Sequence, residues 1–100
     1  MILRYKETAI EDIRETERYI AEKLHNKTAA KELTRKILDA GSLLKENPFM
    51  GAALSGKVDY ETDLRFLVVS KQLMFYRVCD EVIEITRVLD GRQDYLAILL

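Results

Sequence analysis

The first half of the chain carries apolar residues at the spacing of an amphipathic helix. The first such stripe predicts a helix over about residues 9–23, with charged residues on its other faces. The apolar members of this stripe are Ile10, Ile13, Ile20 and Leu24. Thr8 precedes the stripe and Glu11 follows three residues later, which matches a capping box that satisfies the free N–H groups of a helix start.

A second apolar stripe repeats at steps of three and four residues and predicts a longer helix over about residues 27–46. Its members are Ala30, Leu33, Ile37, Ala40 and Leu44. Asn26 or Thr28 supplies the N-cap, and Pro48 ends the element because it disfavours helical geometry in the residue before it. Gly41 costs about 1 kcal/mol relative to Ala inside a helix, so we expect a close approach between the two helices there. The short link predicts an antiparallel helical hairpin with its apolar seam on a sheet.

The remaining segments have the alternation and the β-branched and aromatic residues of strands. A short strand is expected over residues 2–5, and three more over 64–69, 73–78 and 82–89, joined by turns into an antiparallel meander. Residues 49–61 have no period and are expected to form a loop. The predicted fold is α+β, in the order β-α-α-β-β-β, with the helical hairpin packed on a mostly antiparallel four-stranded sheet.

The chain ends on DYLAILL, whose leucines at helical spacing predict a short C-terminal helix. So short a helix is not stable alone, and its apolar side must dock either on the sheet of its own domain or in a partner. With 100 residues and 48% apolar content, we expect a single domain over residues 1–100. The predicted core comprises Ile10, Ile13, Ile20, Leu33, Ile37, Leu44, Phe66, Val68, Phe75 and Ile85.

Charge and composition exclude several function classes. The chain holds 16 Lys and Arg against 17 Asp and Glu, so it has no overall basic field to attract nucleic acid. No apolar stretch approaches the roughly 20 residues of a membrane span, and the start lacks the pattern of a secretory signal, so a cytoplasmic protein without membrane contact is expected. The single cysteine, Cys79, is expected to be a buried hydrophobe, and no metal site or cofactor is predicted.

The run LRFLVVSKQLMFYRVCDEVIEITRVLDGRQDY, residues 64–95, resembles the RelE/ParE superfamily of bacterial toxins. FYRV followed about ten residues later by the RVLDGR strand end carries the resemblance, and the helical hairpin, the ENPFMG connection and the length extend it over nearly the whole chain. The resemblance implies a toxin of a type II toxin–antitoxin system, neutralised by a cognate antitoxin protein. RelE-like members cleave messenger RNA on the ribosome, whereas ParE-like members inhibit DNA gyrase.

RNA cleavage requires a proton acceptor, a proton donor and cations around the phosphate. The resemblance implies that a nuclease would use Arg65, Arg77, Arg92 and Tyr95, although the lysines common in the RelE-like branch are missing. Each arginine also has a structural interpretation. A turn at residues 80–81 would place Arg77 opposite Glu84 as an ion pair, whereas a three-residue turn at 70–72 would set Arg65 opposite Arg77. We expect Arg87 to bond a nearby carboxylate or carbonyl.

A partner-binding surface is expected where the last strand ends and the terminal helix follows, because the resemblance implies that antitoxin helices cover this part of the sheet. Its members are Arg87, Arg92, Tyr95, Leu96, Leu99 and Leu100. The first hypothesis is a ParE-like toxin that binds DNA gyrase, the second a ribosome-dependent messenger RNA endonuclease, and the third an inactive member that binds only its antitoxin. Homodimerisation stays open.

Overall fold

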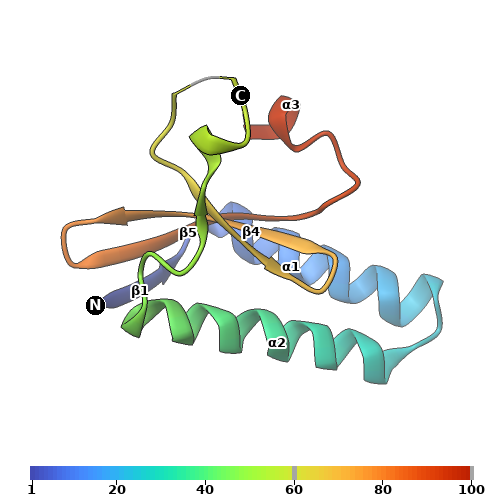
Figure 1. The fold of residues 1–100 in the computed structure, drawn as a ribbon. Coiled ribbons are helices and arrows are strands. Elements are labelled where there is room, and N and C mark those ends of the chain that lie inside the picture. Colours follow the sequence, from blue (N-terminus) through green and yellow to red (C-terminus); the bar gives the residue numbers. More distant parts are fainter. Residues whose placement is uncertain (60, 100) are drawn as a thin grey trace.

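The computed structural model of the chain describes residues 1–59 and 61–99, and its fold is α+β (Figure 1). The predicted strand at the start, the helical hairpin, the meander and the short C-terminal helix are all present. The elements in chain order are β1 (Ile2–Tyr5), α1 (Glu7–Arg18), the π-helical segment η1 (Tyr19–Lys23), α2 (Lys27–Glu46), β2 (Ala52–Ala53), the 3₁₀ turn η2 (Leu54–Gly56), β3 (Arg65–Val69), β4 (Gln72–Cys79), β5 (Val82–Asp90) and α3 (Tyr95–Leu99).

The sheet has five strands in the order β1-β5-β4-β3-β2, and only the β1–β5 pairing is parallel. The prediction of four strands was therefore one short. The extra strand is β2, which pairs with β3 at Phe66 and Arg65 and lies in the segment predicted to be a loop. Two alanines carry no strand pattern of their own, so this pairing depends on the neighbouring strand rather than on local sequence.

The sheet is covered on both faces, with α1 and α2 on one side and α3 and the segment after β2 on the other (Figure 1). Side chains of β4 alternate between the two cores, because successive residues of a strand point to opposite faces. Met74 and Tyr76 join the helix-side core, whereas Leu73 and Phe75 join the core under α3. The central strand is thus buried on both sides, which agrees with its continuous apolar run.

The predicted core is mostly confirmed. Its buried members are Ile13, Ile37, Leu44, Phe75 and Ile85, and its half-buried members are Ile10, Ile20, Leu33 and Phe66. The prediction that Val68 is buried was wrong, since it is 60% exposed on β3. The prediction that Cys79 is buried was also wrong, because it is exposed at the end of β4. Because side chains alternate between the two faces of a strand, both residues point to parts of the sheet surface that the rest of the chain does not cover.

The second helix has the predicted bounds, and the Asn26 side chain accepts a hydrogen bond from the Ala29 N–H at 3.0 Å, which is the expected cap. The capping box of the first helix was wrong. α1 begins at Glu7, and the Thr8 hydroxyl instead donates to the Thr86 carbonyl oxygen at 2.9 Å. A long-range partner therefore takes the hydroxyl that local sequence assigned to the helix start.

The close approach predicted at Gly41 exists, but with the first strand rather than with the other helix. A Cβ atom at this position would collide with the Tyr5 hydroxyl and lie 3.4 Å from Leu3. α2 therefore crosses β1 closely at this glycine. No helix within residues 1–59 and 61–99 is both long and apolar enough to cross a membrane.

Candidate functional site

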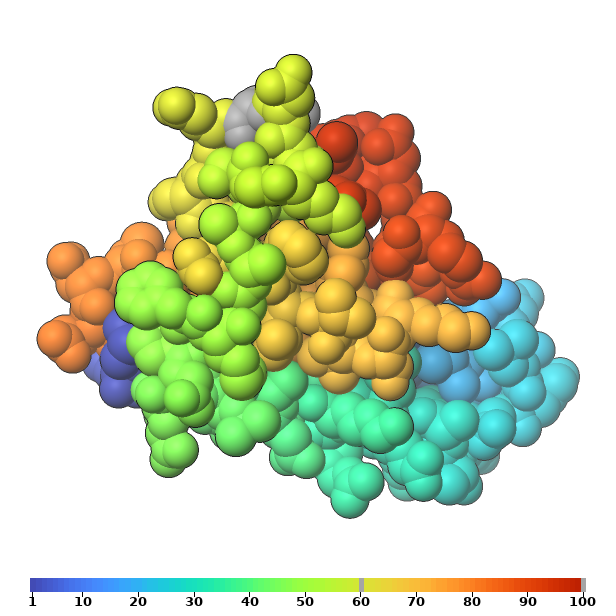
Figure 2. All heavy atoms as spheres, viewed as in Figure 1, coloured from blue at the N-terminus to red at the C-terminus, as the bar shows by residue number. Residues whose placement is uncertain are grey.

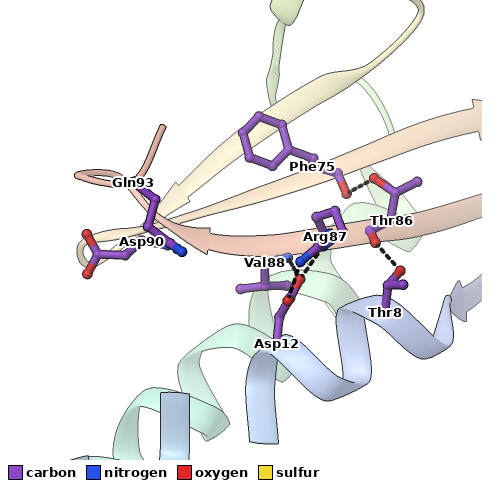
Figure 3. A network of polar contacts seen from close by, with 8 residues as sticks. All are labelled: Thr8, Asp12, Phe75, Thr86, Arg87, Val88, Asp90 and Gln93. Atoms are coloured by element: carbon purple, nitrogen blue, oxygen red, sulfur yellow. Dashed lines mark hydrogen bonds and ion pairs between the residues drawn. The ribbon is translucent and has the colours of Figure 1, made fainter. Parts of the chain in front are cut away.

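Arg87 of β5 is held by Asp12 of α1 (Figure 3). Its Nε and Nη2 atoms donate to the two carboxylate oxygens at 2.7 and 2.8 Å, and the Val88 N–H donates to the same carboxylate at 3.0 Å. This bonding raises the pKa of Arg87 above its ordinary value, chiefly through the hydrogen bond to Asp12. The expectation that Arg87 bonds a carboxylate is confirmed, and the pair fastens helix to sheet.

A β-bulge sets the direction of Arg87. Phe75 pairs with Arg87 and Tyr76 with Ile85, which leaves Thr86 as the extra residue of β5. The Thr86 hydroxyl donates to the Phe75 carbonyl oxygen at 3.1 Å, while the Thr86 carbonyl oxygen accepts from Thr8 (Figure 3). The bulge therefore satisfies the polar groups of the unpaired residue and links this point of the strand to α1.

The last strand ends at Asp90, where the Gly91 N–H donates to the Lys71 carbonyl oxygen at 2.9 Å. Arg92 folds back and donates from Nε and Nη2 to the Asp90 carboxylate, both at 3.0 Å. The hydrogen bonds from Arg92 lower the pKa of Asp90 below its ordinary value and raise the pKa of Arg92. The Arg92 side chain is nevertheless 82% exposed, so this corner presents a cation to the surroundings.

The C-terminal helix α3 docks on the sheet of its own domain. The Tyr95 ring lies 5.5 Å from the Phe75 ring, and Leu99 packs in the same cluster. The Lys57 ammonium lies 5.6 Å from the Tyr95 ring centroid and 5.1 Å from that of Phe66, so the segment after β2 and the C-terminal residues lie side by side (Figure 2). Leu96 is half-buried, and Leu100 lies outside the described residues.

Arg65 clamps the connection between α2 and β2. Its Nη2 atom donates to the carbonyl oxygens of Gly51 at 2.6 Å and Phe49 at 3.3 Å, and its guanidinium lies 5.1 Å from the Phe49 ring centroid. The three-residue turn that would have set Arg65 opposite Arg77 is not formed. The turn has only two residues and its first, Ser70, has a φ of 55°, so Arg65 pairs with Tyr76.

Arg77 lies opposite Glu84, which is the predicted register, but the predicted ion pair between them was wrong. The Arg77 Nε donates to Asp63 at 2.7 Å, whereas Glu84 accepts from Arg4 of β1 at 2.9 Å. Glu84 is flanked by an arginine on each neighbouring strand, and its carboxylate bonds the one on β1. The pairing partner could not be read from the hairpin alone, because β1 lies far away in sequence.

The structure does not bring the four candidate catalytic residues together. Arg65 shares a sheet face with Tyr76, so Arg77, the next residue of β4, points to the opposite face. Arg92 lies two residues beyond Asp90, which pairs with Gln72 at the start of β4, and Arg77 lies five residues further along that strand, about 17 Å at about 3.3 Å per residue. Tyr95 packs on Phe75. Within residues 1–59 and 61–99, no three His, Cys, Asp or Glu side chains form a metal-binding group.

Sequence reasoning missed Asp12 and Asp63, the carboxylates that hold Arg87 and Arg77. Asp12 directly precedes the buried Ile13, and a carboxylate at the edge of a buried helix stripe is a signal that a partner exists. Asp63 lies in a segment without period, where nothing local indicated a role.

The α+β fold, with a helical hairpin on one face of the sheet and an arginine-bearing last strand, is that of the RelE/ParE toxins. The model of the family described as ParE toxin of the type II toxin–antitoxin system, parDE, matches residues 3–95. The chain belongs to this family and is a toxin of a type II toxin–antitoxin system.

Solved structures agree on the fold. The chromosomal ParDE toxin–antitoxin system from P. aeruginosa has a chain with a TM-score of 0.73 and 19% identity, over 90% of this chain and 95% of that one. The E. coli DinJ–YafQ complex gives a TM-score of 0.54 with 16% identity, over 89% and 91% of the two chains. A YafQ mutant from E. coli gives 0.55 with 18% identity, over 94% of each chain. No curated protein sequence matches significantly.

Proposed function

We propose that this toxin acts by binding DNA gyrase in the cytoplasm and that a cognate antitoxin protein neutralises it. The family supports a toxin, and the solved structures similar in fold include a ParDE system and a DinJ–YafQ complex. Gyrase is favoured over RNA as the target because the candidate arginines bond acceptors within the chain.

The observation that carries the proposal is that each candidate arginine already bonds an acceptor within the chain. Arg65 bonds two carbonyl oxygens, while Arg77, Arg87 and Arg92 bond the carboxylates of Asp63, Asp12 and Asp90. Cleavage at a ribose hydroxyl requires cations and a proton-transfer pair converging on one phosphate. Arginines that are separated and engaged in this way suit the binding of another protein better.

The exposed end of β5 is the proposed contact surface for a partner, with Arg92 as its cation and the half-buried Leu96 of α3 as its apolar member. Arg87 supports this surface from beneath, since its side chain is only 29% exposed. Tyr95 and Leu99 hold α3 in place, so their contribution is to position the surface. Leu100 remains a predicted member outside the described residues.

The test measures supercoiling of relaxed plasmid by purified gyrase, with increasing toxin. We expect inhibition by the wild type, reduced inhibition by Arg92→Ala and unchanged inhibition by Arg14→Ala, an exposed arginine on α1 away from this surface. Full supercoiling at saturating toxin would refute the gyrase proposal.

A ribosome-dependent endonuclease is the second candidate, favoured by the exposure of Arg92 three residues before Tyr95. In that case messenger RNA ends mapped in cells expressing the toxin would show new cuts within translated codons, and Arg92→Ala or Tyr95→Phe would abolish them. Intact messages together with inhibited gyrase would exclude the nuclease. Neither effect, with antitoxin binding retained, would identify an inactive member.

The antitoxin proposal is tested separately by thermal unfolding. A ligand that binds only the folded state raises the free energy of unfolding, by about 2.7 kcal/mol at a ligand concentration a hundredfold above Kd. The unfolding temperature rises with it. We expect such a rise with the product of the neighbouring gene, and no change with that product would contradict the pairing.

A further inference from the structure

A trough lies where the helical hairpin meets the end of the sheet. Its first part is a hollow of about 500 Å³ between α1 and the last residues of β5, lined by Asp12, Glu15 and Arg87. We call it the acidic chamber. The second part, the apolar chamber, is a hollow of about 410 Å³ between η1, α2 and the turn at residues 70–71. The chambers share a wall made by Thr16, Tyr19, Gln72, Asp90 and Arg92.

Gln72 supplies an unused hydrogen-bonding group to this wall. It is the first residue of β4 and points toward the helices, because Met74 two residues on is in the helix-side core. The residue is 5% exposed, and its Oε1 atom has no hydrogen-bond partner within the described chain. A buried acceptor without a donor is unfavourable. The terminal torsion of a glutamine side chain is broad, so the amide can turn to present its oxygen to a donor in the trough. The position therefore favours a ligand that carries N–H groups.

The acidic chamber also contains a carboxylate, that of Glu15, which is not engaged in an ion pair within the described residues. Glu11, Asp12 and Glu15 of α1 all attract Arg87 and raise its pKa. Asp12 is occupied by that arginine, and Asp90 on the opposite side is occupied by Arg92. Glu15 lines the chamber and forms no ion pair among residues 1–59 and 61–99. A cation entering the chamber would neutralise it.

The apolar chamber continues directly from this charged end. Ile20, Leu24 and Leu33 contribute its apolar walls, and Tyr19 and Leu24 remain 56% and 57% exposed at its margin. The adjoining segment η1 is π-helical, a geometry that occurs frequently at functional sites. A ligand that fits both chambers must combine an N–H-bearing cation with a neighbouring apolar group.

We infer that the trough binds a segment of a partner protein that inserts an arginine side chain into the acidic chamber and an apolar side chain into the apolar chamber. Arginine fits better than lysine, because its planar guanidinium can donate to the Glu15 carboxylate and the Gln72 amide oxygen together. The site does not depend on the cellular target, since it follows from the chamber walls alone.

The test titrates the full-length protein with the blocked tripeptide acetyl-Leu-Arg-Leu-amide and with its citrulline analogue. Citrulline keeps the planar shape of arginine but replaces one terminal amino group with a carbonyl oxygen and has no charge. Binding is followed by the NMR signals of the Gln72 side-chain amide and by calorimetry. The variants are Glu15→Gln and the matched control Glu11→Gln, because both glutamates are exposed on α1 and attract Arg87, yet only Glu15 lines the chamber.

We expect saturable shifts of the Gln72 amide signals and an affinity about tenfold lower for the citrulline peptide or for Glu15→Gln. Glu11→Gln should bind as the wild type does. Equal binding of both peptides, absence of a Gln72 shift, or an equal loss in the two glutamate variants would overturn the assignment. None of these results bears on gyrase or on messenger RNA, so the proposed function stands or falls separately.

Discussion

Replacing Asp12 with alanine removes the acceptor of three hydrogen bonds that join α1 to β5, at 2.7, 2.8 and 3.0 Å. Hydrogen bonds to charged groups contribute about 1.5–3 kcal/mol each, and breaking a buried ion pair costs about 3–5 kcal/mol. The Arg87 side chain is 29% exposed, so water can recover part of this loss. Alanine also has a helix propensity better than aspartate by up to about 0.7 kcal/mol. The expected net loss is about 2 kcal/mol.

This loss is large against the typical stability of about 5–15 kcal/mol for a domain. It corresponds to a fall of about 8–16 °C in the unfolding temperature of a chain of this size. Urea unfolding monitored by circular dichroism measures it directly. The matched control is Asp63→Ala, which breaks the ion pair with Arg77 at the same N–O distance of 2.7 Å but removes a carboxylate that is 69% exposed.

The control should lose no more than about 1 kcal/mol, because exposed ion pairs contribute little. The double variant Asp12→Ala/Arg87→Ala should be less destabilised than the sum of the two single variants, since each single change leaves its partner unpaired. Equal losses for Asp12→Ala and Asp63→Ala would refute the reasoning that burial makes the helix–sheet pair important.

Three further outcomes are expected. The pKa of Asp90 is lower in the folded chain than its ordinary value of 3.8. The stabilisation that its carboxylate contributes is therefore present above pH 3.8 and is lost as the pH falls through the folded pKa. Asp90→Asn should reduce the dependence on pH of the free energy of unfolding in this range, measured with urea. Gly41→Ala should destabilise by about 1–3 kcal/mol, and adding Tyr5→Phe should restore part of the loss by removing the hydroxyl that the new Cβ meets. Tyr95→Ala should speed hydrogen exchange of the α3 amides while β4 stays protected, because its ring holds this short helix on the sheet.

Covering both faces of the sheet separates structural and functional roles along β5. Ile85 and Val88 both reach the helix-side core across the bulge at Thr86, and Arg87 between them is fixed to α1. Beyond Asp90 the chain leaves the sheet, and Arg92 becomes largely exposed. The exposed end thus follows a packed strand, which fixes the positions of its polar groups while they remain exposed.

Local pattern determined the helix over residues 27–46, the three-stranded meander and the register that sets Arg77 opposite Glu84. These features follow from apolar periodicity and from turn length, and both are properties of neighbouring residues. The same patterns supported the family resemblance that the family model bears out over residues 3–95. Sequence alone was therefore sufficient for the fold class and for the class of protein.

Tertiary structure decided the partners of the polar side chains. Arg87 and Asp12 are 75 residues apart in the chain, and Thr8 and Thr86 are 78 apart, so neither bond has a local signature. Strand β2 and the docking of α3 likewise depend on surfaces that exist only after the sheet has formed. Periodicity tells which side of an element is apolar, whereas the identity of a long-range partner is set by how whole elements pack against one another.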